Sequence, residues 1–80
     1  MKQVLTIDAA IERDNGLLLQ VVGALRELKS PPESFIWSHI PGSNEGRIWM
    51  VVVDDEATIQ ELIAFLGLIP GITNVAHQPG

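Results

Sequence analysis

The 80-residue sequence lacks cysteine, is poor in basic side chains and has no long apolar run, and each shortage excludes a class of function. Without cysteine, the chain can form no disulfide, thiolate metal site or cysteine nucleophile. Five basic residues stand against ten acidic ones, which gives a net charge of −5. Because lysine and arginine supply most of the affinity for phosphates, we expect neither nucleic acid nor an anionic membrane as a partner. No stretch reaches the roughly 18–20 apolar residues of a membrane helix, so we expect a cytoplasmic protein.

The remaining polar residues offer no arrangement suited to catalysis or metal binding. His39 and His77 are the only histidines, and neither has a carboxylate at helical spacing, so we expect structural roles for both. The run Asp54-Asp55-Glu56 is better explained by the start of a helix, whose dipole favours negative charge, than by a hard-cation site. The serines lack the sequence context of a nucleophile elbow. We therefore expect no cofactor, no bound metal and no enzymatic activity.

Apolar residues are abundant for a chain of this size. They make up 46% of the 80 residues, whereas charged residues make up only 19%. The length fits one domain, residues 1–80, and so small a domain buries only about 60–65% of the surface that its unfolded chain exposes. Part of the apolar surface is therefore expected to contact a partner protein or a second copy of the chain. A densely packed monomer is the alternative.

The first half of the chain predicts a strand followed by a helix. Residues 3–12 alternate between apolar and polar side chains, the period of a strand with one face toward a core. A turn follows, in which Asp14 or Asn15 is placed to cap a helix. Between Leu17 and Lys29 the apolar residues recur with the spacing of an amphipathic helix, and Pro31-Pro32 ends it.

The second half of the chain predicts three strands and one helix. Phe35–Ile40 and Arg47–Val53 are rich in β-branched and aromatic residues, and the turn formers of residues 41–46 connect them. A helix begins at the acidic run, carries apolar residues with helical spacing and ends at Gly67. The last strand is Ile72–His77.

The order β-α-β-β-α-β predicts an α+β fold, the ferredoxin-like sandwich. Two right-handed crossovers place four strands in one antiparallel sheet with both helices on one face. The strands at 35–40 and 47–53 are apolar on both sides, so the face without helices needs another cover. The sequence does not determine the strand register, so Trp37, Trp49 or both are expected on that face. We expect a homodimer or higher oligomer with these tryptophans at the interface.

The turn before the first helix is the one local feature that suggests a ligand. Gly16 has no Cβ, so a ligand can approach its backbone closely. The start of a helix also favours an anion such as a carboxylate. The turn is compatible with binding the carboxylate of an amino acid, and an ordinary capped turn is the alternative.

The segment from Asp14 to Leu25 resembles the first loop and helix of ACT domains. It is most similar to the small regulatory subunit of acetohydroxyacid (acetolactate) synthase, which has a Pro-Gly-Val-Leu start and a helix containing Arg-Val-Val-Gly-Leu-Phe. Gly16, Leu18 and Val21-Val22-Gly23 match that pattern in register. Pro32-Glu33-Ser34-Phe35 falls where the family enters its second strand, and the hydrophobic pattern of the second half also follows it.

The resemblance implies a regulatory module that binds an amino acid effector, in that family a branched-chain one such as valine, at a dimer interface. Feedback would then pass to a larger catalytic subunit. The ligand would lie between the first loop of one chain and the second-strand region of the other. The residues implied on the two sides are Arg13, Asp14, Asn15, Gly16, Leu17 and Leu18 from the loop and helix, and Glu33, Ser34 and Phe35 from the second strand.

Three positions depart from the family pattern. Arg13 replaces a ligand-contacting asparagine, Asn15 replaces the proline, and Pro31 replaces an asparagine of the second-strand region. Each lost polar contact weakens ligand binding by about 1–3 kcal/mol. These departures favour an alternative hypothesis, an ACT-like assembly module or stand-alone regulator that binds no small molecule. An enzyme is the least favoured hypothesis.

Overall fold

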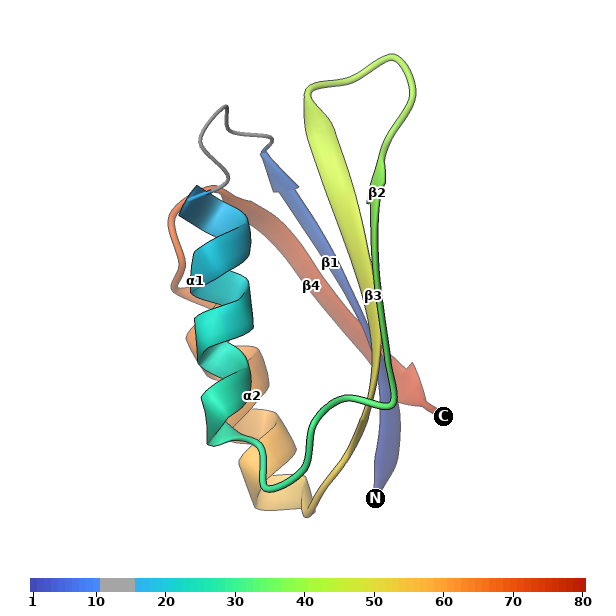
Figure 1. Cartoon of the computed structure of the whole chain (residues 1–80), viewed down its shortest axis with the longest axis vertical. Coiled ribbons are helices and arrows are strands. Elements are labelled where there is room, and N and C mark those ends of the chain that lie inside the picture. The colour runs from blue at the N-terminus through green and yellow to red at the C-terminus, as the bar shows by residue number, and fades with distance from the viewer. Residues whose placement is uncertain (11–15) are drawn as a thin grey trace.

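The computed structural model describes residues 1–10 and 16–80, and the predicted strands and helices occur in the predicted order (Figure 1). Residues 11–15, the end of the predicted first strand and most of the turn, lie outside the described part. The elements are β1 (Lys2–Ala10), α1 (Gly16–Ala24), a 3-10 turn (Leu25–Glu27), β2 (Ser34–His39), β3 (Glu45–Val53), α2 (Glu56–Gly67) and β4 (Ile72–Pro79).

The four strands form one antiparallel sheet in the order β2-β3-β1-β4, so β2 and β4 are its edges. Both helices lie on the same side of this sheet, with α2 beside β4 (Figure 1). This arrangement confirms the predicted ferredoxin-like sandwich. Within the described part of the chain, no helix has the length and apolar character needed to cross a membrane.

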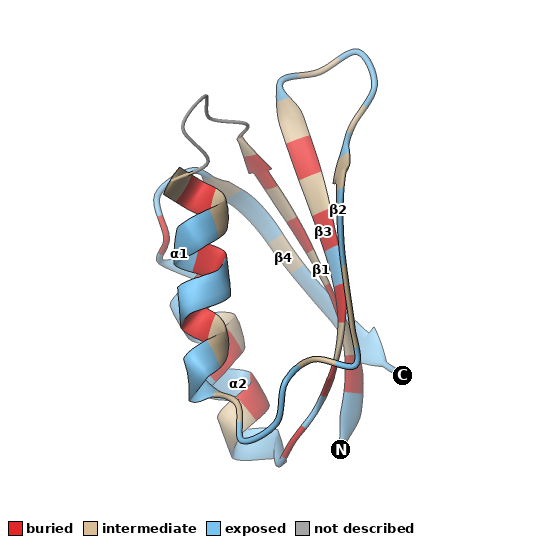
Figure 2. Cartoon of the chain, viewed as in Figure 1, coloured by how far each residue is buried: buried red, intermediate tan, exposed pale blue. Residues whose placement is uncertain are grey.

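The core lies between the helices and one face of the sheet (Figure 2). The alternation predicted for the first strand is confirmed, because Leu5, Ile7 and Ala9 are fully buried while the residues between them are half-buried. Each helix contributes one apolar stripe to the same layer. The other core residues are Leu17, Val21, Ala24, Ile48, Met50, Val52, Ile59, Leu62, Leu66 and Ile69.

The first helix is shorter than the predicted span of Leu17–Lys29. It ends at Ala24, and Leu25–Glu27 forms a 3-10 turn in which the Leu28 N–H donates to the carbonyl of Leu25 at 3.1 Å. The backbone N–H of Lys29 instead donates to Oδ2 of Asp54, at 2.7 Å. Asp54 follows β3, so this bond fixes the chain to the end of the sheet before it enters β2. Periodicity in the sequence does not reveal a competing acceptor that is 25 residues away.

The connections behave as their turn residues predict. Gly42 and Gly71 have φ angles of +77° and +97°, a conformation in which a side chain would be strained. At the start of α2, the Asp55 side chain accepts a hydrogen bond from the Thr58 N–H at 2.8 Å, which makes it the N-cap. The acidic run therefore begins the helix, as predicted.

Candidate functional site

The predicted ligand-binding loop is described only from Gly16 onward, since Arg13, Asp14 and Asn15 lie outside the described residues. Gly16 is the first residue of α1. Leu17 is buried in the core, and Leu18 packs against it. The side chains of these two leucines are thus used for packing, and the first turn of α1 offers a ligand mainly its backbone.

The predicted second-strand side of the site lies at the start of β2. Glu33 donates its backbone N–H to the carbonyl of Val51 at 2.9 Å, and its carboxylate pairs with the Lys2 ammonium at 3.1 Å. Both side chains of this pair are about half exposed, so the pair contributes little to stability. Ser34 and Phe35 are half-buried and point to opposite faces of the sheet, with Phe35 packed against the core.

One chain does not bring the two sides of the predicted site together. Ser34 pairs with Val51 and Val51 with Val4, so the start of β2 is level with the start of β1. The first turn of α1 lies instead near the far end of β1, at Ala10 (Figure 1). Six residues of strand separate these levels, which corresponds to about 20 Å.

The two tryptophans lie on opposite faces of the sheet, which decides a point that the sequence left open. Trp37 pairs with the fully buried Ile48, so it is on the side of the helices. Its ring lies over Gly46, where an added Cβ would come within 2.7 Å of the ring. Trp49 lies on the face without helices and is 37% exposed.

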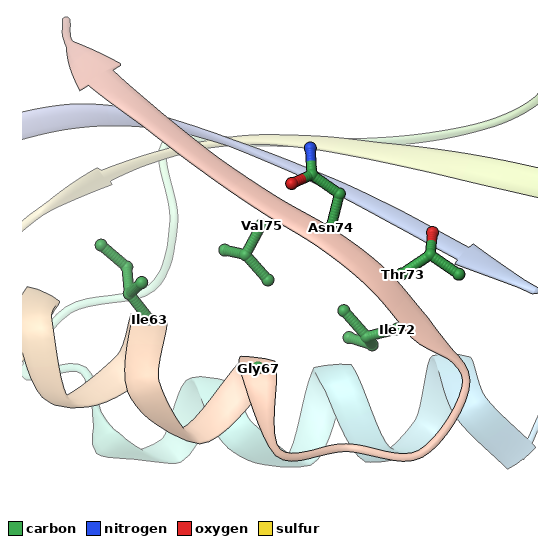
Figure 3. A pocket seen from close by; sticks show the side chains of 6 residues that line it. All are labelled: Ile63, Gly67, Ile72, Thr73, Asn74 and Val75. Carbon is green, nitrogen blue, oxygen red and sulfur yellow. The ribbon is translucent and has the colours of Figure 1, made fainter.

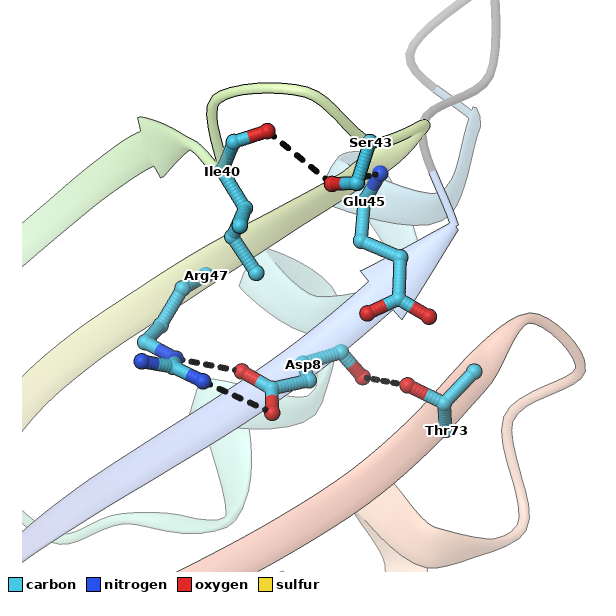
Figure 4. A network of polar contacts seen from close by, with 6 residues as sticks. All are labelled: Asp8, Ile40, Ser43, Glu45, Arg47 and Thr73. Carbon is cyan, nitrogen blue, oxygen red and sulfur yellow. Dashed lines mark hydrogen bonds and ion pairs between the residues drawn. The ribbon is translucent and has the colours of Figure 1, made fainter.

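The face without helices is apolar around Trp49 and also carries the ion pair between Arg47 and Asp8. Ile36 and Val53 are 54% and 39% exposed there. The Arg47 guanidinium binds both carboxylate oxygens of Asp8, at 2.6 and 3.2 Å (Figure 4). The guanidinium also lies 5.8 Å from the centre of the Trp49 ring. Its hydrogen bonds and charge hold the pKa of Asp8 below the ordinary value of 3.8. The ion pair therefore links the neighbouring strands β3 and β1, and its cation lies beside the tryptophan.

Both histidines have hydrogen-bond partners, as expected for structural residues. His39 Nε2 lies 2.8 Å from the carbonyl oxygen of Ser43 in the β2–β3 connection. Ser43 also donates its hydroxyl to the Ile40 carbonyl and accepts the Glu45 N–H (Figure 4). His77 Nδ1 lies 3.0 Å from Oε1 of Gln3. Among residues 1–10 and 16–80, no cluster of histidines and carboxylates is suited to a metal ion.

A groove between α2 and β4 is a feature that the sequence reasoning missed. It has a volume of about 370 Å³ and lies along the edge of the sheet (Figure 3). Two sequence signals pointed to it: Gly67 ends α2 without a side chain, and the last strand has no charged residue. The lining residues are Ile63, Gly67, Ile72, Thr73, Asn74 and Val75.

The sequence matches no protein-family model and no curated protein, whereas the fold matches several solved structures closely. The ACT domain of GTP pyrophosphokinase from Chlorobium tepidum superposes with a TM-score of 0.75 at 14% identity, covering 98% of this chain and 97% of that one. This chain has an ACT-like fold.

Two further structures share the fold. An uncharacterized protein of Thermotoga maritima gives a TM-score of 0.81 at 24% identity, covering 98% of this chain and 94% of the other. The C-terminal domain of the MgtC protein from Mycobacterium tuberculosis gives 0.76 at 15% identity, covering 99% and 86%. These likenesses bear out the ACT part of the sequence resemblance and give no support to acetolactate synthase in particular.

Proposed function

We propose that this chain is a regulatory ACT-type module that binds an amino acid or a related small carboxylate between two copies of itself. The observation that carries the proposal is the separation of the two predicted recognition segments. Their described parts, the first turn of α1 and the start of β2, lie at opposite ends of one ACT-like domain, which is where a two-fold dimer needs them if each ligand is to contact both chains.

The exposed edge of β2 provides a route to such a dimer. The Ile40 N–H donates to the Glu45 carbonyl of β3 at 2.9 Å. Because successive residues of a strand point their backbone groups to opposite sides, those of Trp37, three residues earlier, point away from β3. Antiparallel pairing of two β2 strands, centred on Trp37, sets Phe35 of one copy opposite His39 of the other. His39 is level with Gly46 and Ala9, near the end of β1. Glu33 and Ser34 of one copy thereby approach the end of the domain at which α1 of the other begins.

The chemistry of the two segments suits a zwitterion. The positive end of the α1 dipole favours a carboxylate, and Gly16 allows close approach to its backbone. On the other side, the carboxylate of Glu33 and the hydroxyl of Ser34 are groups that accept hydrogen bonds from an ammonium. A ligand that bridges the copies shifts the population toward one dimer arrangement, which a larger catalytic subunit then senses. A feedback regulatory subunit of acetolactate synthase is the specific form of this proposal that the sequence resemblance favours.

The first experiment is a thermal-shift screen of the purified chain against the twenty amino acids, with its mass in solution measured alongside. A ligand that binds only the folded dimer raises the melting temperature with its concentration. The Gly16→Asp variant should lose this response because it places a negative charge and a side chain at the start of α1. Gly23→Asp is the matched control, since Gly23 is exposed on the same helix and has open space around it. An equal response of both variants would contradict the loop assignment.

A second candidate function, supported by a separate observation, is an assembly module that binds no small molecule. The exposed apolar patch formed by Ile36, Trp49 and Val53 suits contact with protein, and the departures at Arg13, Asn15 and Pro31 weaken the ligand site. A stable dimer that shows no shift with any amino acid at millimolar concentration would favour this function over the first.

A further inference from the structure

The outer edge of β4 presents backbone groups that no neighbouring strand of the described sheet uses. β4 is the last strand in the sheet order, and the Gly80 N–H donates to the Lys2 carbonyl at 3.0 Å. In an antiparallel pair, every second residue points its backbone groups toward the neighbouring strand, so those of Gln78 and Ala76 also face β1. The N–H and C=O groups of Val75 and His77 therefore point away from the sheet. Such a row of groups is a template for another strand.

This edge also lacks the features that usually prevent strand pairing. Proteins commonly protect an edge strand with charged side chains, especially lysine, or with proline. The eight residues of β4 include no charged side chain. Pro79 is the only proline in the strand and stands next to its end, so it limits pairing there and leaves the middle accessible.

The groove between β4 and α2 gives an added strand a place for its side chains. Figure 3 shows Ile63 of α2 and Ile72 and Val75 of β4 pointing into the space between the two elements, whereas Asn74 points to the other side. A strand added to the edge alternates its side chains between the two faces of the sheet. Those on the helix side enter the groove, whose volume of about 370 Å³ accommodates aliphatic side chains.

Gly67 keeps the groove open at the α2 side. A Cβ built at this position meets no atom within 4 Å, and the residue does not have a positive φ. A larger side chain can therefore replace the glycine without strain and occupy space that a peptide would otherwise use. The position offers a direct test of what the groove holds.

Charge and symmetry indicate what kind of strand is added. With a net charge of −5, the chain attracts a basic partner and repels an acidic one. A second copy of the chain fits poorly, because pairing at β4 together with the β2 dimer proposed above would continue the sheet from copy to copy without closing. We propose that the β4 edge and its groove bind a short extended segment of another protein, basic overall and with aliphatic residues at alternate positions.

The test uses backbone amide NMR of the whole chain titrated with the peptide KVTVTK, blocked at both ends. We expect shifts at Val75, His77 and the groove residues, and none along β2. Gly67→Leu should weaken binding by about tenfold, the loss expected when one apolar side chain is excluded from its pocket. Gly23→Leu, at an exposed helical position with open space, is the matched control and should bind like the unaltered chain.

Two further peptides make the result independent of how the variants fold. EVTVTE should bind more weakly than KVTVTK, and a KVTVTK peptide with alternate amides N-methylated should lose binding, since it cannot complete the ladder. Shifts confined to β2, or equal affinity for the methylated peptide, would overturn the proposal. So would concentration-dependent broadening of the β4 amides without peptide, which indicates pairing between copies. None of these outcomes bears on the amino acid response, so the two proposals fail separately.

Discussion

The two faces of the sheet differ in how completely they are covered, although the same strands make both. On the side of the helices, Leu5, Ile7 and Ile48 are fully buried. On the other side, Thr6 and Val51 are half-buried and Trp49 remains 37% exposed. The two helices of this small domain therefore cover only one of the two faces of the sheet. The difference teaches that stability is concentrated on one face, while the other is available for association.

The largest difference in the effect of substitution on stability is expected between neighbouring residues of β1. Ile7→Ala removes a fully buried side chain and leaves a cavity, which should lower the free energy of unfolding by about 2–5 kcal/mol. Thr6→Ala, one residue away on the other face, should change it by less than about 0.5 kcal/mol. Chemical denaturation of both variants measures the contrast. Similar losses for both would mean that the uncovered face is already packed in solution.

The next contrast concerns association. Trp49→Ser removes the largest apolar side chain of the uncovered face and should weaken contacts made across it by about 2 kcal/mol, or roughly 30-fold. Trp37→Ser tests the β2 edge instead, because Trp37 lies on that edge strand, on the face of the sheet that the helices cover elsewhere, and is itself 37% exposed. Sedimentation equilibrium of both variants separates an edge contact from a face contact. If both retain the mass of the unaltered protein, neither tryptophan lies at the interface.

A smaller effect is expected from Gly46→Ala on the helix side of β3. The new Cβ would lie 2.7 Å from the Trp37 ring, so the ring must shift. Such overpacking costs about 1–3 kcal/mol. Tryptophan fluorescence should report the moved ring, and thermal unfolding the loss of stability. An unchanged spectrum and midpoint would show that the ring does not rest on Gly46 in solution.

The smallest effect belongs to the ion pair on the uncovered face. Because Arg47 lowers the pKa of Asp8, the pair stabilises the fold above the ordinary value of 3.8 and loses this effect as the pH falls through the lowered pKa. The Arg47 side chain is 39% exposed, so solvent screening keeps the contribution of the pair small. Asp8→Asn should be slightly less stable than the unaltered chain at pH 7, and the difference should be smaller at pH 2. A constant difference between the two proteins at both pH values would contradict this account.

The element order and the core were predictable because they follow from local periodicity. The alternation of residues 3–10 and the stripe formed by Ile59, Leu62 and Leu66 select one buried face for each element. The predicted helix extended too far, to Lys29, whereas α1 ends at Ala24. The acceptor that binds the Lys29 N–H is the side chain of Asp54, which is distant in the sequence. For the candidate site, the sequence predicted the two segments, and the structure showed that the first turn of α1 and the start of β2 lie at opposite ends of the domain.

The sequence by itself determined the α+β class, the apolar face of each element and the acidic character of the surface, because each depends on residue type and short spacing. Only the tertiary structure decided the strand register, and with it the placement of Trp37 and Trp49 on opposite faces. Register depends on pairing between residues far apart in the chain, and a shift of one residue exchanges the two faces. The groove beside β4 arises in the same way, from a helix and an edge strand that meet only when the sheet is complete.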